Sequence, residues 1–393
     1  MKYNFDELID RRNTGAVKTD LCKKMFGTDD LIPLWVADMD FRTPDFIIDA
    51  INNRCKHPIL GYTVPDEEYF NSIIRWIDAR HGWKLERNWL GFLPGIVPGL
   101  AFAVNALTQT GDQIIIQPPV YPPFIQVPSK NGRELIYNPL KVVEGRFEMD
   151  LKDLEYKITD RTRMFILCNP HNPGGRTWDA DTLIKVAEIC HKHGVLVVSD
   201  EIHSDMALPG NVHTPFASVS ELAEQNSITY MAPSKTFNMA GLVSSSYIIP
   251  NSEIRKKFSD FMDNSELANG NIFAYVAAQA AYENGTEWLT EMIRYIQGNV
   301  NYIVEFLEKN VPQIKPMIPQ ASFLIWLDCA GLEMNSHQLQ DFMVKEARLG
   351  LNKGTTFGPG GEQHLRLNIG CSREVLKQAM EQLKSAINSR LNK

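Results

Sequence analysis

Short apolar runs alternate with longer amphipathic stretches through the middle of the chain. Five runs of four to six residues consist mainly of apolar and β-branched side chains, which is typical of strands buried on both faces of a parallel sheet. These candidate strands cover residues 113–117, 163–168, 195–199, 228–231 and 246–249. Their alternation with helical patterns predicts βαβ units, and therefore an α/β sheet with helices on both faces.

Two helices between these strands have recognisable ends. Residues 183–190 carry apolar side chains at helical spacing; Asp179 or Asp181 is the expected N-cap, and Gly194 supplies a left-handed C-cap. A second helix is expected over residues 96–109.

The pattern changes after about residue 285. A long amphipathic helix, a proline-containing connector, a strand and two further helices are expected there, over residues 287–310, 311–320, 322–327, 337–348 and 373–388. This order of elements is typical of a smaller α+β unit. The N-terminal 45 residues have no strong period and are candidates for the same unit.

Composition and charge exclude several classes of protein. The 393 residues are 44% hydrophobic and 22% charged, which is ordinary for a globular protein. The net charge of −7 disfavours nucleic acid and anionic membranes as general partners. No signal peptide or membrane span is recognisable, so we expect a cytoplasmic protein.

The six cysteines show no CxxC spacing and are expected to be free thiols in a reducing compartment. One group, Cys190, His191 and His193, has some resemblance to a metal site. We interpret it as the polar end of a helix closed by Gly194, and we expect no metal.

Three short polar segments follow predicted strands, where the carboxyl ends of an α/β sheet form the ligand crevice. They place Asn172 in CNPHNPGG, Asp200 in VSDEIH and Lys235 in APSKTFN. Taken singly, they could be a plain turn, a helix cap and a solvated surface lysine. A rigid loop can also aim an amide at a ligand, a buried carboxylate can pair with a cationic ring nitrogen, and a desolvated lysine can form a Schiff base with an aldehyde.

These three residues together resemble a known family. Asn172, Asp200 and Lys235 occur in the order and spacing of pyridoxal-phosphate enzymes of the aspartate-aminotransferase fold type. The flanking sequence narrows the resemblance to the MalY/PatB family of cystathionine β-lyases. The motifs that resemble this family are WVADMDF, GYT, SDEIHSD and APSKTFN. The likeness covers about residues 3–385.

The resemblance implies fold type I of the pyridoxal-phosphate-dependent transferases. In that fold a mainly parallel seven-stranded sheet flanked by helices forms a large domain, beside a smaller α+β domain. We expect the large domain at residues 46–285 and the small one from residues 1–45 and 286–393, because Arg366 must meet a cofactor anchored by Lys235.

The resemblance also assigns catalytic roles to Lys235, Asp200 and Tyr121. Lys235 would bind pyridoxal 5′-phosphate and then remove the α-proton of the substrate. Asp200 would keep the pyridine nitrogen protonated, so that the ring can accept electrons. Asn172 would donate to the phenolic oxygen of the cofactor, and Tyr121 would stack on its ring.

The cofactor phosphate needs donors. Gly95, Ile96 and Val97, at the start of the helix at 96–109, offer backbone N–H groups, although the glycine could also be an ordinary turn. Ser234 would add a hydroxyl. Tyr62 matches a tyrosine that reaches the phosphate from the neighbouring subunit, which implies a homodimer with composite sites; the alternative is a turn aromatic.

Arg366, in HLRLN, would bind the α-carboxylate of an amino acid through its planar guanidinium, although a surface arginine would show the same pattern. Asn172, Trp35 and Asp38 are the other residues expected at the substrate.

Three positions depart from the wider fold type. Val243 stands where many relatives carry a phosphate-binding arginine, and His203, expected at the cofactor, stands where they often have a tyrosine. Both agree with the lyase branch. Pro122 replaces a second aromatic residue of some members.

The expected activity is a carbon–sulfur β-lyase. It would cleave L-cystathionine or related S-substituted cysteines by α,β-elimination to a thiol, pyruvate and ammonia. One alternative is an aminotransferase, which shares the first half of the mechanism. Another is a regulatory protein that keeps the fold and acts through a partner.

Overall fold

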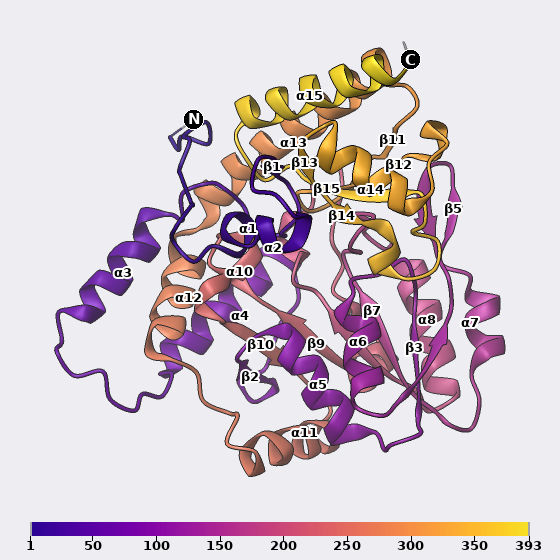
Figure 1. Ribbon diagram of the computed structural model, residues 1–393. Helices are drawn as coiled ribbons and strands as arrows, with labels where there is room; N and C mark the ends of the chain where they lie inside the picture. The colour runs from indigo at the N-terminus through magenta and orange to yellow at the C-terminus, as the bar shows by residue number, and fades with distance from the viewer. Residues whose placement is uncertain (1, 392–393) are drawn as a thin grey trace.

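The computed structural model describes residues 2–391, and a seven-stranded sheet lies at its centre (Figure 1). The strand order is β2-β10-β9-β8-β7-β3-β4. The bounds are β2 Leu90–Leu93, β3 Gln113–Ile116, β4 Glu134–Tyr137, β7 Thr162–Cys168, β8 Leu196–Asp200, β9 Ser227–Met231 and β10 Ser245–Ile248. Strand β10 is antiparallel to both its neighbours and the other pairings are parallel, so the sheet is mainly parallel, as predicted.

The five predicted strands are confirmed as β3, β7, β8, β9 and β10. The apolar runs did not predict β2 and β4. Strand β2, LGFL, is buried but contains a glycine, which has no side chain to pack, and β4 lies at the sheet edge, where its side chains are partly exposed. Neither strand therefore carries the long apolar run that marks a strand buried in the middle of a sheet.

Helices cover both faces of this sheet. Successive side chains of each strand point to opposite faces, so an apolar strand presents apolar side chains to a layer of helices on each side. On one face Ile114 and Ile116 pack with residues of α5 (Ile96–Leu107), α6 (Pro123–Lys130) and α11 (Ser252–Asn264). On the other, Ile115 packs with residues of α7 (Leu151–Lys157), α8 (Ala180–Lys192) and α9 (Glu221–Gln225). The prediction of a two-sided α/β sheet is therefore confirmed.

Helix α8 has the ends that the sequence predicts. Asp179 is the N-cap and accepts the backbone N–H of Thr182 at 2.8 Å. The chain leaves the helix through Gly194, whose φ of 66° favours glycine. Cys190 is buried in the helix, and among residues 2–391 no group of three His, Cys, Asp or Glu side chains is arranged to hold a metal ion.

A second, antiparallel sheet forms from the C-terminal third of the chain, in the order β11-β12-β15-β14. These strands are β11 Lys315–Met317, β12 Leu324–Asp328, β14 Asn352–Lys353 and β15 His364–Asn368. The helices of this region are α13 Thr286–Asn310, α14 Ser336–Lys345 and α15 Arg373–Leu391. Strand β11 falls inside the expected connector, where prolines obscure a strand pattern.

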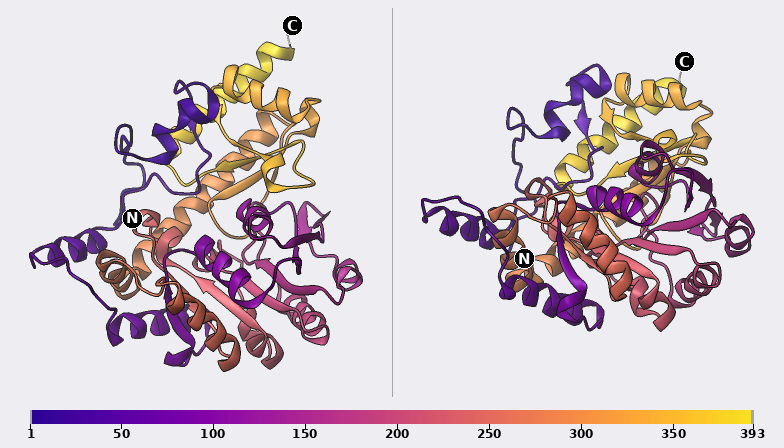
Figure 2. Two further views of the ribbon diagram at one scale, coloured as in Figure 1. Left: turned by 60° about the horizontal axis from the view of Figure 1, so that its bottom comes forward. Right: turned by 90° about the horizontal axis from the view of Figure 1, so that it is seen from below.

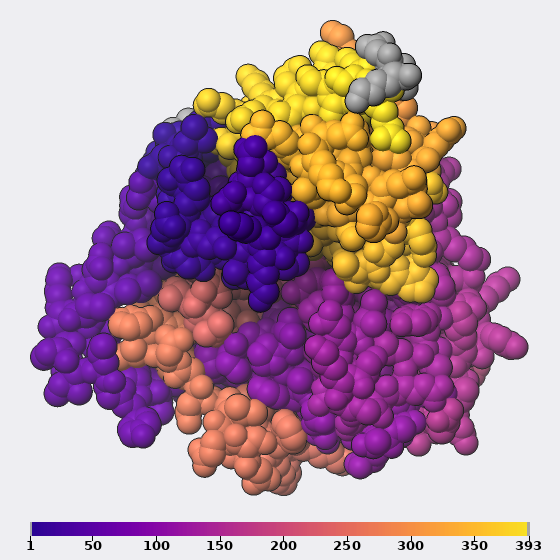
Figure 3. Space-filling view, in the orientation of Figure 1, coloured from indigo at the N-terminus to yellow at the C-terminus, as the bar shows by residue number. Residues whose placement is uncertain are grey.

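The N-terminal segment packs against this second sheet region. Strand β1 (Ile32–Pro33) pairs in parallel with β13 (Leu349–Gly350), although the two are over 300 positions apart in the sequence. Figures 2 and 3 show indigo N-terminal residues beside yellow C-terminal ones, and the ribbons of Figure 2 show both on the same side of the seven-stranded sheet. The remaining elements are α1 Val17–Asp20, α2 Cys22–Phe26, α3 Asp45–Cys55, α4 Glu67–His81, β5 Lys141–Val143, β6 Arg146–Glu148, α10 Pro233–Thr236 and α12 Ile272–Asn284.

Two further sequence expectations concern membranes and thiols. Across residues 2–391, none of the helices is both long and apolar enough to span a bilayer. All six cysteines are free; Cys55 is exposed and the others are buried.

Candidate active site

A cavity of about 260 Å³ lies beside the carboxyl ends of the strands of the main sheet. Its wall contains the residues that follow β2, β3, β7, β8 and β9, so five strand ends converge on one space. The predicted residues that line it are Gly95, Ile96, Val97, Tyr121, Asn172, Asp200, His203, Ser234 and Lys235. The structure therefore brings together nine of the thirteen residues proposed from the sequence.

Lys235 lies on α10, one turn after β9, and its amine borders the cavity. Its Nζ donates a hydrogen bond of 2.6 Å to the carbonyl of Ala37. Burial lowers the pKa of Lys235 to about 8, against the opposing effect of the Asp38 carboxylate. The amine is therefore far easier to deprotonate near neutral pH than a solvated lysine.

Asp200 is the last residue of β8 and is buried. Its carboxylate accepts one hydrogen bond, from the backbone N–H of Ile202 at 3.1 Å. Burial raises the pKa of Asp200 to about 7. A cation placed beside this carboxylate would return it to its charged form, because an opposite charge offsets the cost of desolvation.

The start of α5 forms one wall of the cavity. Gly95, the N-cap, has a φ of 131°, and a Cβ at this position would lie 3.3 Å from Pro98 Cδ. No side chain caps the helix, so the N–H groups of its first turn are available beside the cavity. Backbone donors and the positive end of a twelve-residue helix suit an anion there, and Ser234 also lines the cavity.

Arg366 lies on β15 of the second sheet, outside the cavity lining, and contacts the cavity wall through Asn172. Its Nη1 donates to Asn172 Oδ1 at 3.0 Å, and its Nη2 donates to the carbonyl of Trp35 at 2.8 Å and to Asn352 Oδ1 at 2.7 Å. Its Nε is buried without a partner among the described residues, and burial lowers the pKa of Arg366 to about 10. The amide NH2 of Asn172 remains for a ligand.

His203 and Tyr121 supply aromatic walls. His203 is buried edge-on to Phe323, and burial lowers the pKa of its imidazole to about 3, so the ring is neutral at pH 7. Burial raises the pKa of the Tyr121 phenol, so this hydroxyl also stays neutral. Val243, at the position where many relatives carry an arginine, lines the cavity and adds no charge.

Trp35 and Asp38, proposed for substrate binding, lie outside the cavity lining. The Trp35 indole N–H donates to the carbonyl of Lys18 at 3.0 Å, and only the Trp35 carbonyl contacts Arg366. The Asp38 carboxylate forms ion pairs with Arg11 at 2.6 Å and with Lys18 at 3.6 Å. In this structure both residues therefore support the site from outside its wall.

Tyr62 lies apart from the other candidates. It belongs to the extended segment between α3 and α4, and its side chain is fully exposed. It does not line the cavity formed within this chain. A role for Tyr62 in a site would thus require another subunit.

One buried cluster was missed from the sequence. Asp205 accepts hydrogen bonds from Trp76 Nε1 at 2.9 Å and from Thr236 Oγ1 at 3.0 Å, and His81 Nε2 lies 3.2 Å away. Because Thr236 follows Lys235 directly, this cluster fixes the helix that carries the amine. The SDEIHSD motif contains Asp205, but two of its three partners, Trp76 and His81, come from a helix more than 120 positions away.

The groups around the cavity fit pyridoxal phosphate. The cofactor has an aldehyde, a ring nitrogen that can carry a proton, and a phosphate. Lys235 offers the aldehyde an amine with a lowered pKa, and Asp200 offers the ring nitrogen a buried carboxylate with few partners. The start of α5 offers the phosphate uncapped N–H groups. Each chemical feature of the cofactor therefore has a matching group.

Comparisons with known proteins agree with this fit. The family model "Aminotransferase class I and II" matches residues 29–383. The chain is 46% identical to cystathionine β-lyase PatB of Bacillus subtilis, over 98% of this chain and 100% of that protein.

Two solved structures are similar over nearly the whole chain. Cystalysin from Treponema denticola, which contains a pyridoxal 5′-phosphate cofactor, superposes with a TM-score of 0.96 at 34% identity, covering 99% of this chain and 100% of that one. The pyridoxal-phosphate-bound C–S lyase from Staphylococcus hominis has a TM-score of 0.91 at 36% identity, with 98% of both chains covered. Both structures thus carry the cofactor that the cavity fits.

Proposed function

Because this chain belongs to the class I and II aminotransferase family, in its MalY/PatB branch, we propose that it is a pyridoxal-phosphate-dependent carbon–sulfur β-lyase. Its substrate is L-cystathionine or a related S-substituted cysteine. With cystathionine, one water is consumed and homocysteine, pyruvate and ammonia are released. The observation that carries the proposal is the Lys235 amine, with its lowered pKa, facing the same cavity as the buried Asp200.

Lys235 is the proposed base. Bound pyridoxal phosphate supplies an aldehyde for amines and a cationic ring that stores the electrons released when the α-proton leaves. Lys235 Nζ, with a pKa lowered to about 8, takes that proton from the α-carbon. A base whose pKa lies near the working pH combines a large deprotonated fraction with sufficient basicity.

Asp200 holds a proton on the cofactor ring nitrogen, because its buried carboxylate is stabilised by a cation beside it. Asn172 donates its amide N–H to the phenolic oxygen, and Tyr121 covers one face of the ring. These three groups, all in the cavity wall, orient the cofactor and exclude water from it.

The start of α5 binds the cofactor phosphate. Ile96, Val97 and Ser234 all line the cavity, so the two N–H groups and the hydroxyl are its proposed donors to the phosphate. Gly95 has no side chain, so the backbone can approach the anion closely. Its positive φ also disfavours any other residue at this position. His203, neutral at pH 7, packs beside the cofactor without adding charge.

Arg366 binds the α-carboxylate of the substrate. Its unpartnered Nε and its contact with Asn172 place a cation next to the cofactor position. Carboxylate and guanidinium form a bidentate pair, which fixes the α-carbon relative to Lys235.

An assay with and without a keto acid tests the proposed function. With L-cystathionine alone, we expect thiol and pyruvate at a rate that does not change when 2-oxoglutarate is added. An aminotransferase would instead depend on the keto acid and would form glutamate from it. Product that appears only after 2-oxoglutarate is supplied would refute the lyase proposal.

We further propose a homodimer in which Tyr62 enters the partner's site. The segment that carries Tyr62 also exposes the large apolar residues Ile59, Leu60 and Val64. Such an apolar segment on the surface is typical of a protein interface, and a second copy is the expected partner.

Mixing two inactive variants tests the composite site. Tyr62→Phe and Lys235→Ala are each expected to be inactive or nearly so, whereas a mixed dimer contains one intact site. We therefore expect up to about one quarter of the wild-type activity after random subunit exchange, since half of the dimers are mixed and each has one intact site of two. Activity that stays at the level of the parents, in dimers shown to have exchanged, would contradict a shared site.

We propose that residues 46–285 form a cofactor domain and that residues 1–45 and 286–393 form a smaller domain. The pairing of β1 with β13 supports the second unit, since it ties the N-terminal segment to the C-terminal region. In this arrangement Lys235 and Asn172 in the cavity wall belong to the larger domain, and Ala37 in the wall and Arg366, which contacts Asn172, belong to the smaller one.

We also propose that the enzyme acts in the cytoplasm. The six free cysteines support this location, because a reducing compartment keeps thiols unpaired.

A further inference from the structure

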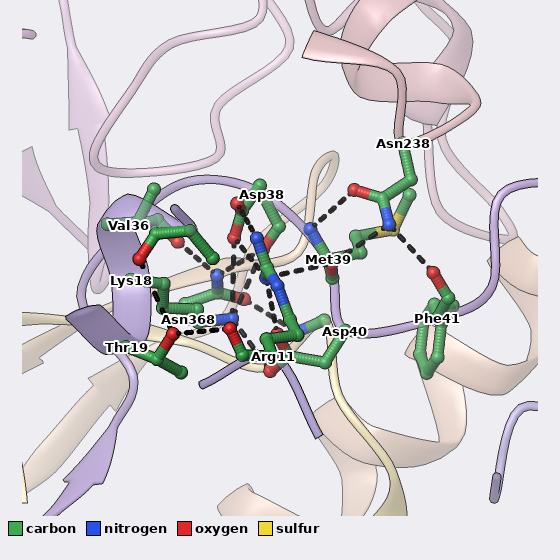
Figure 4. A network of polar contacts seen from close by, with 12 residues as sticks. Arg11, Lys18, Thr19, Val36, Asp38, Met39, Asp40, Phe41, Asn238 and Asn368 are labelled. Carbon is green, nitrogen blue, oxygen red and sulfur yellow. Dashed lines mark hydrogen bonds and ion pairs between the residues drawn. The ribbon is translucent and has the colours of Figure 1, made fainter. Parts of the chain in front are cut away.

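The segment of residues 35–41, WVADMDF, contacts both Lys235 on helix α10 and Arg366 on strand β15. We call it the strap. It has no regular secondary structure, and its peptide groups are instead held by side chains from other parts of the chain (Figure 4). Buried peptide groups outside helices and sheets need such partners.

Two carbonyls of the strap contact the two cations of the site. The carbonyl of Trp35 accepts from Arg366 Nη2 at 2.8 Å, and the carbonyl of Ala37 accepts from Lys235 Nζ at 2.6 Å. These acceptors are two residues apart in the same extended segment. The position of the strap therefore links the position of Arg366 to that of Lys235.

Asn368 holds the strap on the Arg366 side. It lies two residues after Arg366 on β15 and is fully buried. Its amide nitrogen donates to the carbonyl of Val36 and, at 2.7 Å, to that of Asp38. Val36 directly follows Trp35, whose carbonyl Arg366 contacts, so Asn368 ties this end of the strap to the strand that carries Arg366.

Asn238 holds the strap on the Lys235 side. It lies three residues after Lys235, and its φ of 54° is left-handed. Its Oδ1 accepts the N–H of Met39 at 3.0 Å, while its Nδ2 donates to the carbonyls of Met39 at 2.9 Å and Phe41 at 2.7 Å. The side chain therefore completes three hydrogen bonds to one segment.

Four charged residues form ion pairs along the side of the strap that faces the N-terminal segment (Figure 4). Arg11 pairs with Asp38 at 2.6 Å and with Asp40 at 2.7 Å, and the buried Lys18 pairs with Asp40 at 2.8 Å. Two cations meet two carboxylates, so the group is neutral. The strap is thus held at both ends and along its outer edge.

We propose that Asn368 and Asn238 are positioning residues that, through the strap, set Arg366 and Lys235 for the reaction; this inference rests on the proposed function. Neither asparagine lines the cavity, so neither contacts the reacting atoms. Each acts on a different end of the strap. Loss of Asn368 frees the Arg366 end, and loss of Asn238 frees the Lys235 end.

Two single variants of the holoenzyme separate these effects. Asn368→Ala removes both donors to the strap; we expect KM for the amino-acid substrate to rise about 10-fold while kcat stays within about threefold. Asn238→Gly keeps the left-handed backbone without strain and removes only the amide. For it we expect kcat to fall about 10-fold while KM stays within about threefold.

A matched control is Asn138→Ala. Asn138 is also fully buried, and its amide nitrogen donates to the carbonyl of Asp150 at 3.1 Å, at the edge of the main sheet. We expect this variant to lose stability while keeping both kinetic constants. If Asn368→Ala does not fold, Asn368→Ser, which keeps one hydroxyl donor, should give a smaller rise in KM.

Binding measured without turnover distinguishes this inference from the lyase proposal. L-Alanine has a carboxylate but no leaving group at the β-carbon, so its binding can be followed by the visible absorption of the cofactor. We expect its apparent dissociation constant to rise about 10-fold in Asn368→Ala and to stay within about threefold in Asn238→Gly. Equal changes in both variants, or changes in the kinetic constants of Asn138→Ala as large as theirs, would overturn the inference. Absence of lyase activity in the wild type would refute only the proposed function.

Discussion

Lys235→Ala is expected to abolish turnover, with a loss of at least about 10⁴-fold in kcat. The variant loses the side chain that we propose both to bind the cofactor aldehyde and to remove the α-proton. We also expect loss of the visible absorption band that the lysine-bound cofactor gives. Both effects follow from one side chain, because Lys235 is the amine in the cavity wall.

Lys256→Ala provides the control for this measurement. Lys256 is exposed and forms an ion pair with Asp260 at 2.7 Å on the surface helix α11. We expect this variant to keep the wild-type absorption spectrum and rate, since an exposed ion pair contributes little to stability. A Lys235→Ala protein that retained the band and the activity would contradict the assignment.

Asp200→Asn is expected to have opposite effects on activity and on stability. Without the carboxylate, no group in the cavity wall holds a proton on the cofactor ring, and we expect kcat to fall by about 10²–10³-fold. The apo-protein should nevertheless gain stability above pH 7, by on the order of 2–4 kcal/mol, because a buried charged carboxylate is replaced by a neutral amide.

The sign of the stability effect follows from the pKa of Asp200. Burial raises it from 3.8 to about 7 in the folded protein, so the folded state binds more protons than the unfolded state between these values. Stability of the wild-type apo-protein therefore falls as the pH rises from about 4 to 7, and Asp200→Asn removes that contribution. Denaturant titrations of both apo-proteins at pH 5 and pH 8 measure it. A difference between the two proteins that does not grow with pH would contradict a raised pKa.

Sequence patterns predicted three residues that meet at the cavity, because the parallel strands have a strong signature. Asn172, Asp200 and Lys235 each follow a long apolar run, and such runs end at one edge of a parallel sheet. Their convergence on one cavity could therefore be expected from local patterns. The edge strand β4 and the glycine-containing strand β2 lack such runs and were not predicted.

The supporting contacts could not be predicted in the same way. Asp38 was expected to meet the substrate, yet its carboxylate pairs with Arg11 and Lys18. Both cations lie in an N-terminal segment without strong periodicity, so no local pattern places them. Asn238 and Asn368 were within the quoted motifs, but only the tertiary structure shows that both bind the strap.

Products released from L-cystathionine by the purified enzyme, with no keto acid present, test the central claim most directly. We predict equal amounts of homocysteine, pyruvate and ammonia from the wild type, and none above the background from Lys235→Ala. Amino transfer without thiol release, or equal product formation by the two proteins, would contradict a lyase that works through this cavity.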